Sequence, residues 1–409
     1  MNNEPIGQSE PSQPGGKINN VAPPLQPQPT NVVASSPESP SGALPPTPPA
    51  GPPKSKSKLM IIVLIAIILL AAIGGGLWWH SHSSTKTSSS QSNTAPTIRI
   101  GLSLDTLKEL RWAQDRDFMI ERAQANSASV TTFVADSNDQ TQISQIENLI
   151  AQKVSVLIIV PHDAKALAPT IAEAHSAGIK VIAYDRLILN SDLDMYVSFD
   201  STKVGQYEAS NVMDAVPKTV TVPNVMLVGG SPTDNNALLV HTGAMSILQP
   251  LVTAGKAKIV FDQYSADWNP DIAYANVKQY LAGGSRVDAI IAANDGTASG
   301  VVKALQEKGL AGKIPVSGQD AELPAVQRLV AGTQTVTVYK PIKALAYKAV
   351  DIALAFAKGQ TPTTTGKINN DQKDVLAYLL NPVAVTKDNI NSTVIKDGFL
   401  SSKDVYSTN

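Results

Sequence analysis

Residues 180–186 read KVIAYDR, and this stretch carries the pattern that decides the fold. A short, mainly apolar run at 180–184 is followed at once by an acid and a base, Asp185 and Arg186. Such runs, rich in β-branched residues and bounded by polar ones, predict buried strands. Polar side chains directly after a strand lie at its carboxyl end, which is where open α/β sheets bind their ligands.

Similar runs recur on both sides of this stretch, with helical patterns between them. Residues 141–152 show one such pattern, because their isoleucine and leucine side chains share one face, and we expect Asp139 to cap this helix. A repeat of roughly 25 residues per strand–helix unit, with strands apolar on both faces, predicts a parallel sheet covered by helices. The strands predicted for this first series are 98–104, 129–135, 154–160 and 180–184.

A second series restarts further along the chain and predicts a second lobe. About nine or ten strand–helix units are too many for one doubly wound sheet, so we interpret residues 197–200 as a connection between two α/β lobes with a ligand cleft between them. A TIM barrel is the alternative, but it requires eight uninterrupted units, and the tail from about Thr361 lacks that rhythm. The second series of strands is predicted at 225–228, 258–261, 289–292, 314–316 and 336–339.

The region before the first strand predicts a membrane anchor. Residues 59–79, LMIIVLIAIILLAAIGGGLWW, are uncharged and apolar, and as a helix they would span roughly 31 Å, the thickness of a bilayer core. Lys54, Lys56 and Lys58 precede this run and predict a cytoplasmic N-terminus, with the remainder of the chain extracytoplasmic. Residues 1–58 are Pro-rich and predicted to be disordered, and residues 80–96 predict a flexible Ser-rich tether. A cleaved signal peptide is the alternative, but its apolar region is usually shorter and nearer the N-terminus.

Composition excludes several classes of function. The net charge of −1 argues against a nucleic-acid partner, and the absence of cysteine excludes disulfides, cysteine-ligated metal sites and a cysteine-linked lipid anchor. Several carboxylates near a cleft raise the possibility of a glycoside hydrolase, but each has an amide or a cation nearby, which favours binding over acid catalysis. No nucleophile-elbow, phosphate-loop, dinucleotide or zinc-protease motif is present. We therefore predict a binding protein that is not an enzyme and needs no cofactor or metal.

The residues that follow the predicted strands suit a sugar. Carboxylates accept hydrogen bonds, guanidinium groups donate them and amides do both, so a ring of these groups satisfies the hydroxyls of a monosaccharide. The apolar C–H faces of the sugar pack on indole rings. Each residue taken singly has an ordinary alternative as a helix cap, a surface ion pair or a core residue. The strand-end residues are Asp105, Lys108, Arg111, Trp112, Asp185, Arg186, 229–236, 262–268, Asn294, Asp295, Gln319, Asp320 and Lys340.

A series of longer motifs resembles the type I periplasmic sugar-binding family of bacterial ABC importers, and within it the D-xylose binders. The resemblance runs from about Ile98 to Phe399 and implies two Rossmann-like lobes, joined by three hinge crossings, that close on one sugar. The first lobe would comprise residues 97–200 and about 341–374, and the second lobe 201–340 and about 375–409. The motifs are LRW at 110–112, DRD at 115–117, QIEN at 145–148, AYDR at 183–186, GGSPTDNNA at 229–237, AND at 293–295, SGQD at 317–320, AGTQT at 331–335 and TVYKP at 337–341.

The resemblance also implies which residues bind the sugar. Trp268 would stack on one face of the ring and Trp112 would cover the other. Lys108 stands where the family pattern has arginine, and residues 262–268 also depart from that pattern, which concerns the pentose preference. The implied substrate-binding residues are Lys108, Arg111, Trp112, Asp185, Arg186, Asn236, Trp268, Asn294, Asp320 and Lys340.

These expectations combine into one functional hypothesis. The chain is expected to be a monomeric, membrane-anchored solute-binding protein that captures a monosaccharide, D-xylose first, outside the cell. It would deliver the sugar to the permease and ATPase subunits of an ABC importer. Two alternatives stay open: a sugar-sensing ectodomain that signals to a membrane receptor, and a binder of another pentose or hexose.

Overall fold

The computed structural model describes residues 98–407, and residues 1–97 and 408–409 lie outside the described part. The predicted tail, the predicted membrane helix at 59–79 and the predicted tether at 80–96 therefore fall outside the described residues. Within residues 98–407, no helix combines the length and the apolar character needed to cross a bilayer.

The first lobe is built on a seven-stranded sheet of order β10-β11-β5-β4-β3-β1-β2. All neighbouring strands are parallel except β10, which pairs antiparallel with β11 at the edge. The central strands are buried on both faces, as the near-continuous apolar runs predict. The strands are β1 (Ile98–Leu104), β2 (Ala128–Val134), β3 (Val156–Ile159), β4 (Lys180–Tyr184), β5 (Met195–Phe199), β10 (Gly366–Asn369) and β11 (Asp374–Leu380).

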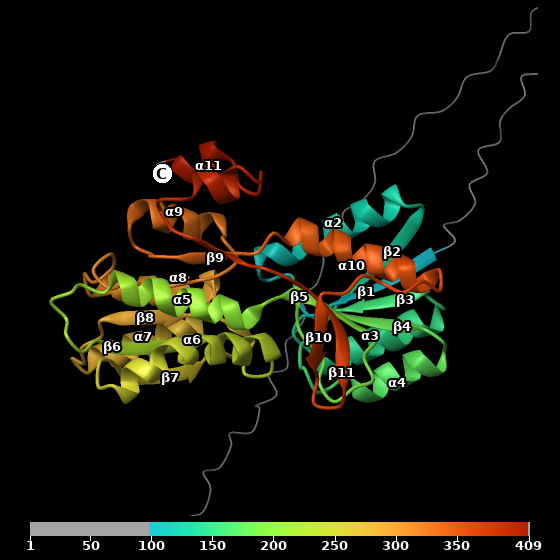
Figure 1. Ribbon diagram of the computed structural model, residues 1–409, viewed down its shortest axis with the longest axis horizontal. Helices are drawn as coiled ribbons and strands as arrows, with labels where there is room; N and C mark the ends of the chain where they lie inside the picture. The colour runs from blue at the N-terminus through green and yellow to red at the C-terminus, as the bar shows by residue number, and fades with distance from the viewer. Residues whose placement is uncertain (1–97, 408–409) are drawn as a thin grey trace, which may run out of the picture. The chain divides into compact units, whose positions relative to one another are not determined.

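Two helices cover each face of this sheet. α2 (Leu110–Ala125) and α10 (Ile342–Ala357) pack together on one face, and α3 (Asp139–Ala151) and α4 (Ala168–Ser176) lie on the other (Figure 1). Successive residues of β3 point to opposite faces, so Ile158 joins the core under α2 and α10, and Leu157 joins the core under α3 and α4.

The second lobe has a three-stranded parallel sheet of order β7-β6-β8 and a two-stranded antiparallel sheet of β9 and β12. α5 and α6 cover one face of the three-stranded sheet, and α7 and α8 cover the other. The strands are β6 (Asn224–Gly229), β7 (Lys258–Tyr264), β8 (Ala289–Ala292), β9 (Thr337–Tyr339) and β12 (Val383–Val385). The helices are α5 (Ser201–Ala215), α6 (Asn235–Thr253), η1 (Ala266–Trp268), α7 (Pro270–Ala282), α8 (Asp295–Glu307), α9 (Leu323–Ala331), η2 (Asn391–Ile395) and α11 (Ser402–Tyr406).

The chain passes between the lobes three times. It leaves the first sheet after β5, returns between β9 and α10, and leaves again between β11 and β12. Residues 375–380, which we expected in the second lobe, lie in β11 and pair with β5, so the third crossing comes after Leu380.

The predicted strands at 98–104, 180–184 and 289–292 are confirmed with the same bounds. The interpretation of 197–200 as a connection is wrong, because residues 197–199 end the buried strand β5 and only Asp200 begins the crossing. Ser198 interrupts the apolar run of this strand, and its Oγ donates to the carbonyl of Asp185 at 2.6 Å, which lets a hydroxyl lie in the core.

Two smaller expectations also need correction. Residues 314–316 form no strand, since only Val316 makes an isolated bridge to Ile290. The cap of α3 is Asn138 rather than Asp139, because the Asn138 side chain accepts a hydrogen bond from the backbone N–H of Thr141 at 2.8 Å.

Close packing of α5 against α6 depends on two glycines. A Cβ on Gly205 would lie 1.9 Å from the carbonyl oxygen of Val240, and a Cβ on Gly243 would lie 2.0 Å from that of Thr202. These contacts are with backbone atoms, which cannot rotate away, so the two helices meet at a distance that only glycine permits.

We expect Gly243→Ala to lower the free energy of unfolding by about 1–3 kcal/mol, because the added methyl group must push α5 and α6 apart. Denaturant titration followed by circular dichroism measures this change. Gly283→Ala is the control, since its Cβ would lie at an ordinary 3.6 Å from the nearest atom, the carbonyl oxygen of Tyr280. Equal stability of the two variants would contradict the packing argument.

Candidate functional site

A cavity lies between the carboxyl ends of the strands of the two lobes, with an empty volume of about 310 Å³ that is partly open to solvent. Nine of the ten predicted substrate-binding residues line it. The lining residues are Glu109, Arg111, Trp112, Asp185, Arg186, Asp234, Asn236, Trp268, Asn294, Gln319, Asp320 and Lys340.

Lys108 is the predicted residue that does not line this cavity. Its side chain is exposed, and its Nζ donates to Ser137 Oγ at 3.3 Å. It lines a neighbouring hollow instead, together with Glu109 and Trp268.

Arg111 is fixed from the first lobe by buried partners. It lies in the first turn of α2, and its Nε contacts Asp115 Oδ2 at 3.0 Å, one helical turn further on. The hydroxyl of Tyr184 donates to the other oxygen of Asp115. The Arg111 guanidinium lies 4.3 Å from the centre of the Trp112 ring. Helix spacing and a buried tyrosine thus hold the cation in one orientation.

Asp185 and Asp320 face each other across the cleft, with cations between them. Arg111 contacts Asp185 at 2.8 Å and Asp320 at 3.6 Å, and Lys340 Nζ contacts Asp320 at 2.8 Å and Asp185 at 3.9 Å. Burial opposes ionisation of Asp185, but Arg111 and Lys340 hold its pKa below the usual range. Asp185 is therefore a carboxylate at neutral pH and accepts hydrogen bonds.

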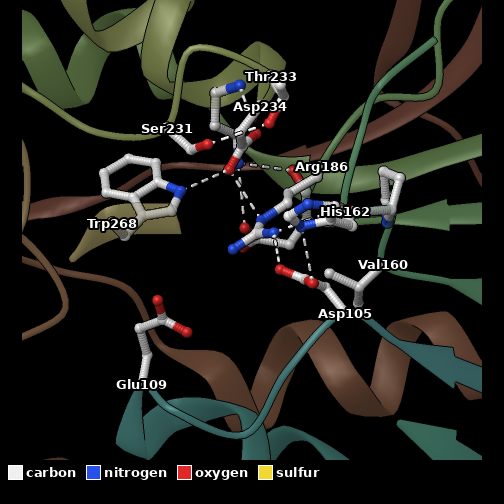
Figure 2. Close-up of polar contacts among 12 residues, drawn as sticks. Asp105, Glu109, Val160, His162, Arg186, Ser231, Thr233, Asp234 and Trp268 are labelled. Carbon is white, nitrogen blue, oxygen red and sulfur yellow. Dashed lines mark hydrogen bonds and ion pairs between the residues drawn. The ribbon is translucent and has the colours of Figure 1, made fainter. Parts of the chain in front are cut away.

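Arg186 makes a second ion-pair cluster, with Asp105 and Asp234 (Figure 2). Its Nη1 contacts Asp105 Oδ2 at 2.6 Å in the first lobe, and its Nε contacts Asp234 Oδ2 at 2.8 Å in the second. Trp268 Nε1 donates to the same Asp234 oxygen at 3.1 Å. Asp234 therefore holds a cation of one lobe and an indole of the other, and Arg186 retains Nη2 as a donor towards the cavity.

His162 completes this cluster on the first-lobe side (Figure 2). Its Nδ1 lies 3.0 Å from Asp105 Oδ1, and its Nε2 lies 4.0 Å from Asp267 Oδ1 of the second lobe. The hydrogen bond to Asp105 raises the pKa of His162 above its usual range, although partial burial opposes this.

Asn236 connects the lobes through its amide. Its Nδ2 donates to both the carbonyl oxygen and the Oδ1 of Asp185, each at 3.0 Å, and its Oδ1 accepts from the hydroxyl of Tyr196 at 3.3 Å. Asn294 and Gln319 each use one side-chain atom in a local hydrogen bond, which leaves Asn294 Nδ2 and Gln319 Oε1 for other partners. Asn294 Oδ1 caps α8, and Gln319 Nε2 donates to the carbonyl of Ala293 at 2.7 Å.

Backbone strain gathers at this site. Five residues other than glycine have positive φ there. Such a conformation costs of order 1–3 kcal/mol per residue and persists only where the surrounding structure holds it. Backbone hydrogen bonds impose it at two of them, since Asp185 N donates to Val197 O and Asp320 N to Val338 O, both at 2.8 Å. The five are Asp185 (62°), Asp267 (52°), Trp268 (54°), Asp320 (94°) and Ala321 (51°).

Trp268 owes its position to a glycine. A Cβ on Gly230 would lie 2.2–2.4 Å from three atoms of the indole, so the ring occupies the space that any larger side chain would fill. The indole is 8% exposed and lines the cavity. Trp112 also lines it, but its ring packs against the guanidinium groups of Arg111 and Arg186.

The set of implied substrate-binding residues did not include three lining residues, Glu109, Asp234 and Gln319, although the wider list of strand-end residues contained the last two. Asp234 and Gln319 belong to the strand-end motifs and could have been selected there. Glu109 precedes a helix, where an acid has an ordinary role as a cap, but its side chain makes no cap hydrogen bond. Residues 98–407 contain no cluster of three or more metal-ligating side chains.

Asp295 supports the site from behind, without lining it. Its carboxylate accepts from Gln334 Nε2 at 2.8 Å, from Thr337 Oγ1 at 2.8 Å and from the N–H of Glu322 at 3.0 Å, and so ties down the loop that carries Asp320. Burial raises the pKa of Asp295 to about 7, against the effects of Arg328 and these hydrogen bonds.

Comparison with known proteins shows the family to which the chain belongs. The model of the periplasmic binding protein domain family matches residues 100–361. The D-xylose-binding periplasmic protein of Haemophilus influenzae is 46% identical over 318 residues, which cover 78% of this chain and 95% of that protein. The D-xylose-binding periplasmic protein of Escherichia coli is 45% identical over 306 residues, which cover 75% and 92%.

A solved structure has a similar fold. It is a carbohydrate transporter solute binding protein from Chloroflexus aurantiacus in complex with D-glucose, with a TM-score of 0.70 and 32% identity. The match covers 75% of this chain and 98% of that one.

Because the folded pKa of Asp295 is raised from 3.8 to about 7, the native state binds a proton that the unfolded state has released between these values. The stability of the wild type should therefore fall, relative to Asp295→Asn, as pH rises from about 4 to about 7. Unfolding by denaturant at pH 4 and pH 8 measures the difference. A difference that stays constant over this range would contradict the raised pKa.

Proposed function

Because the chain belongs to the type I periplasmic sugar-binding family of ABC importers, we propose that it captures one monosaccharide in the cavity between its lobes, with D-xylose as the first candidate. The family consists of binding proteins that catalyse no reaction. The single observation that carries the proposal is the lining of the cavity, in which carboxylates, guanidinium groups and amides from both lobes surround a space of about 310 Å³ beside Trp268.

The choice of D-xylose rests on the relatives. Two D-xylose-binding periplasmic proteins are 45–46% identical to this chain. A multiple sugar-binding periplasmic receptor of Rhizobium radiobacter is 36% identical over 90% of its length, and the Chloroflexus aurantiacus structure holds D-glucose. Another pentose or a hexose is therefore the alternative ligand.

Recognition follows from the charge state of the site. The ionised carboxylate of Asp185 accepts from sugar hydroxyls, and Arg186 Nη2, Asn294 and Lys340 donate or accept from other directions. The indole of Trp268 packs on a C–H face of the ring. Because these groups come from both lobes, the sugar makes all of its contacts only when the lobes are together, and binding favours the closed form.

Delivery and anchoring belong to the same proposal. The closed form would present both lobes to a permease, and the ATPase subunits would supply the energy for transport. The apolar run at 59–79 and the lysines before it favour an N-terminal membrane helix that holds the binding domain at the outer surface. A monomer suffices for this role, because one chain contributes both walls of the cavity.

Calorimetric titration of the full-length protein with D-xylose, D-ribose, L-arabinose, D-glucose and D-galactose tests the function directly. We expect D-xylose to bind at micromolar or lower concentration. Asp185→Ala should weaken its binding by about a hundredfold, because the change removes an acceptor and leaves Arg111 and Lys340 with Asp320 as the one carboxylate that they share. Asp192→Ala, at a surface pair with Lys373, is the control.

Two results of this titration would contradict the proposal. Unchanged affinity in Asp185→Ala would mean that the sugar binds elsewhere. Absence of heat with every sugar would mean that the cavity does not serve monosaccharides.

Asp234→Asn tests the closure step. Asparagine keeps the cap of α6 and the shape of the side chain but removes the charge that holds Arg186 across the cleft. We expect sugar to dissociate about tenfold faster, with little change in the association rate. Asp351→Asn breaks the pair with Arg122, which lies within the first lobe, and serves as the control in stopped-flow measurements. Equal dissociation rates in the two variants would contradict a cross-lobe role.

A further inference from the structure

The cavity continues into a second hollow, and Glu109 lies where the two meet. This hollow, which we call the mouth, has an empty volume of about 940 Å³ including open solvent and is lined by residues of both lobes. Three residues line both the cavity and the mouth: Glu109, Trp268 and Asn294. Other residues line the mouth but not the cavity, among them Lys108, Leu110 and Glu322. Leu110 is 61% exposed at its edge.

Four residues of the other cavity walls are fixed by ion pairs. Arg111, Asp185, Asp320 and Lys340 are buried and committed to one another by contacts of 2.8–3.9 Å. Moving any one of them would break a buried ion pair at a cost of several kcal/mol. A ligand with more atoms than a pentose can extend towards the mouth without disturbing these pairs.

The carboxylate of Glu109 is held in place and aimed at this junction. Its Oε2 accepts from Trp112 Nε1 at 2.8 Å, which leaves Oε1 for a ligand. Figure 2 shows the carboxylate pointing into the space between Trp268 and Arg186. Asp185, Asp234 and Asp320 each pair with a cation, whereas Glu109 makes no ion pair within residues 98–407. Burial raises the pKa of Glu109 above its usual range, and Arg186 opposes this shift.

Sugars differ at the atoms that this junction would meet. D-xylopyranose and D-glucopyranose share every ring hydroxyl and differ only by the hydroxymethyl group on C5 of glucose. We propose that Glu109 sets the preference between pentoses and hexoses, because the hydroxymethyl group of a hexose projects into the mouth and its hydroxyl donates to Glu109 Oε1. This inference rests on the proposed function and adds the residue that decides the substrate range.

The two kinds of sugar should therefore depend differently on this carboxylate. A bound pentose leaves Oε1 to water in the mouth, so the loss of the acceptor has little effect on pentose binding. A bound hexose uses Oε1 as the acceptor of a hydrogen bond to a charged group, which is stronger than a neutral one. Removing the carboxylate should thus lower hexose affinity and spare pentose affinity.

The test compares D-xylose and D-glucose by calorimetric titration in the full-length wild type, Glu109→Gln and Glu109→Leu. We expect the ratio of glucose affinity to xylose affinity to fall about tenfold or more in Glu109→Leu. In Glu109→Gln, which keeps the shape and an acceptor oxygen, we expect a fall of about threefold. Glu121→Gln is the control, because it removes the same charge from α2 at an exposed position, where Glu121 accepts from the hydroxyl of Tyr347.

Each outcome bears on the inference in one direction. A fall of the ratio with xylose affinity nearly unchanged supports it. Equal weakening of both sugars would overturn it, since Glu109 would then be a general ligand, and so would an unchanged ratio in both Glu109 variants. Wild type that binds xylose but no glucose at millimolar concentration would also overturn it. Wild type that binds neither sugar would instead contradict the proposed function.

Discussion

The arrangement of the site depends on buried charges that alternate in sign across the cleft. Arg111 and Lys340 lie between Asp185 of one lobe and Asp320 of the other, and Arg186 lies between Asp105 and Asp234. Each ion has opposite charges as neighbours, so burial costs less than it would for an isolated ion. The same pairs that neutralise the charges also fix the distance between the lobes, and therefore the size of the cavity.

Local packing, hydrogen bonds and backbone turns position the side chains of the site. Gly230 leaves space for the indole of Trp268, and Asp295 ties down the loop of Asp320. Asp185, directly after β4, and Asp320 both have positive φ angles, which turn the backbone at these two cavity residues. The strain is tolerated because each residue's N–H still finds a carbonyl in a neighbouring strand.

Most of the fold could be predicted because strands and polar strand ends leave local signals in the sequence. β4 and β8 are short, almost wholly apolar runs, and β1 was predicted although it contains Arg99 and Ser103. The end of β5, where Ser198 and Asp200 flank Phe199, was instead interpreted as a connection. The partners of each charge could not be predicted in the same way. Asp185 and Arg186 are adjacent, yet Asp185 pairs with Arg111 and Lys340 whereas Arg186 pairs with Asp105 and Asp234, all of them on other elements. The sequence therefore predicts which charged residues lie at strand ends, but the ion pairs that they form depend on the folded structure.

The three crossings have a consequence for the order of assembly. The first sheet gains two of its strands from β10 and β11, and β12 is the strand that pairs with β9. β10, β11 and β12 all come after residue 365 in the chain. A growing chain cannot complete either lobe until this late segment has been made. The same stretch of polypeptide thus completes both lobes, so a truncation or a destabilising substitution there impairs the folding of both lobes.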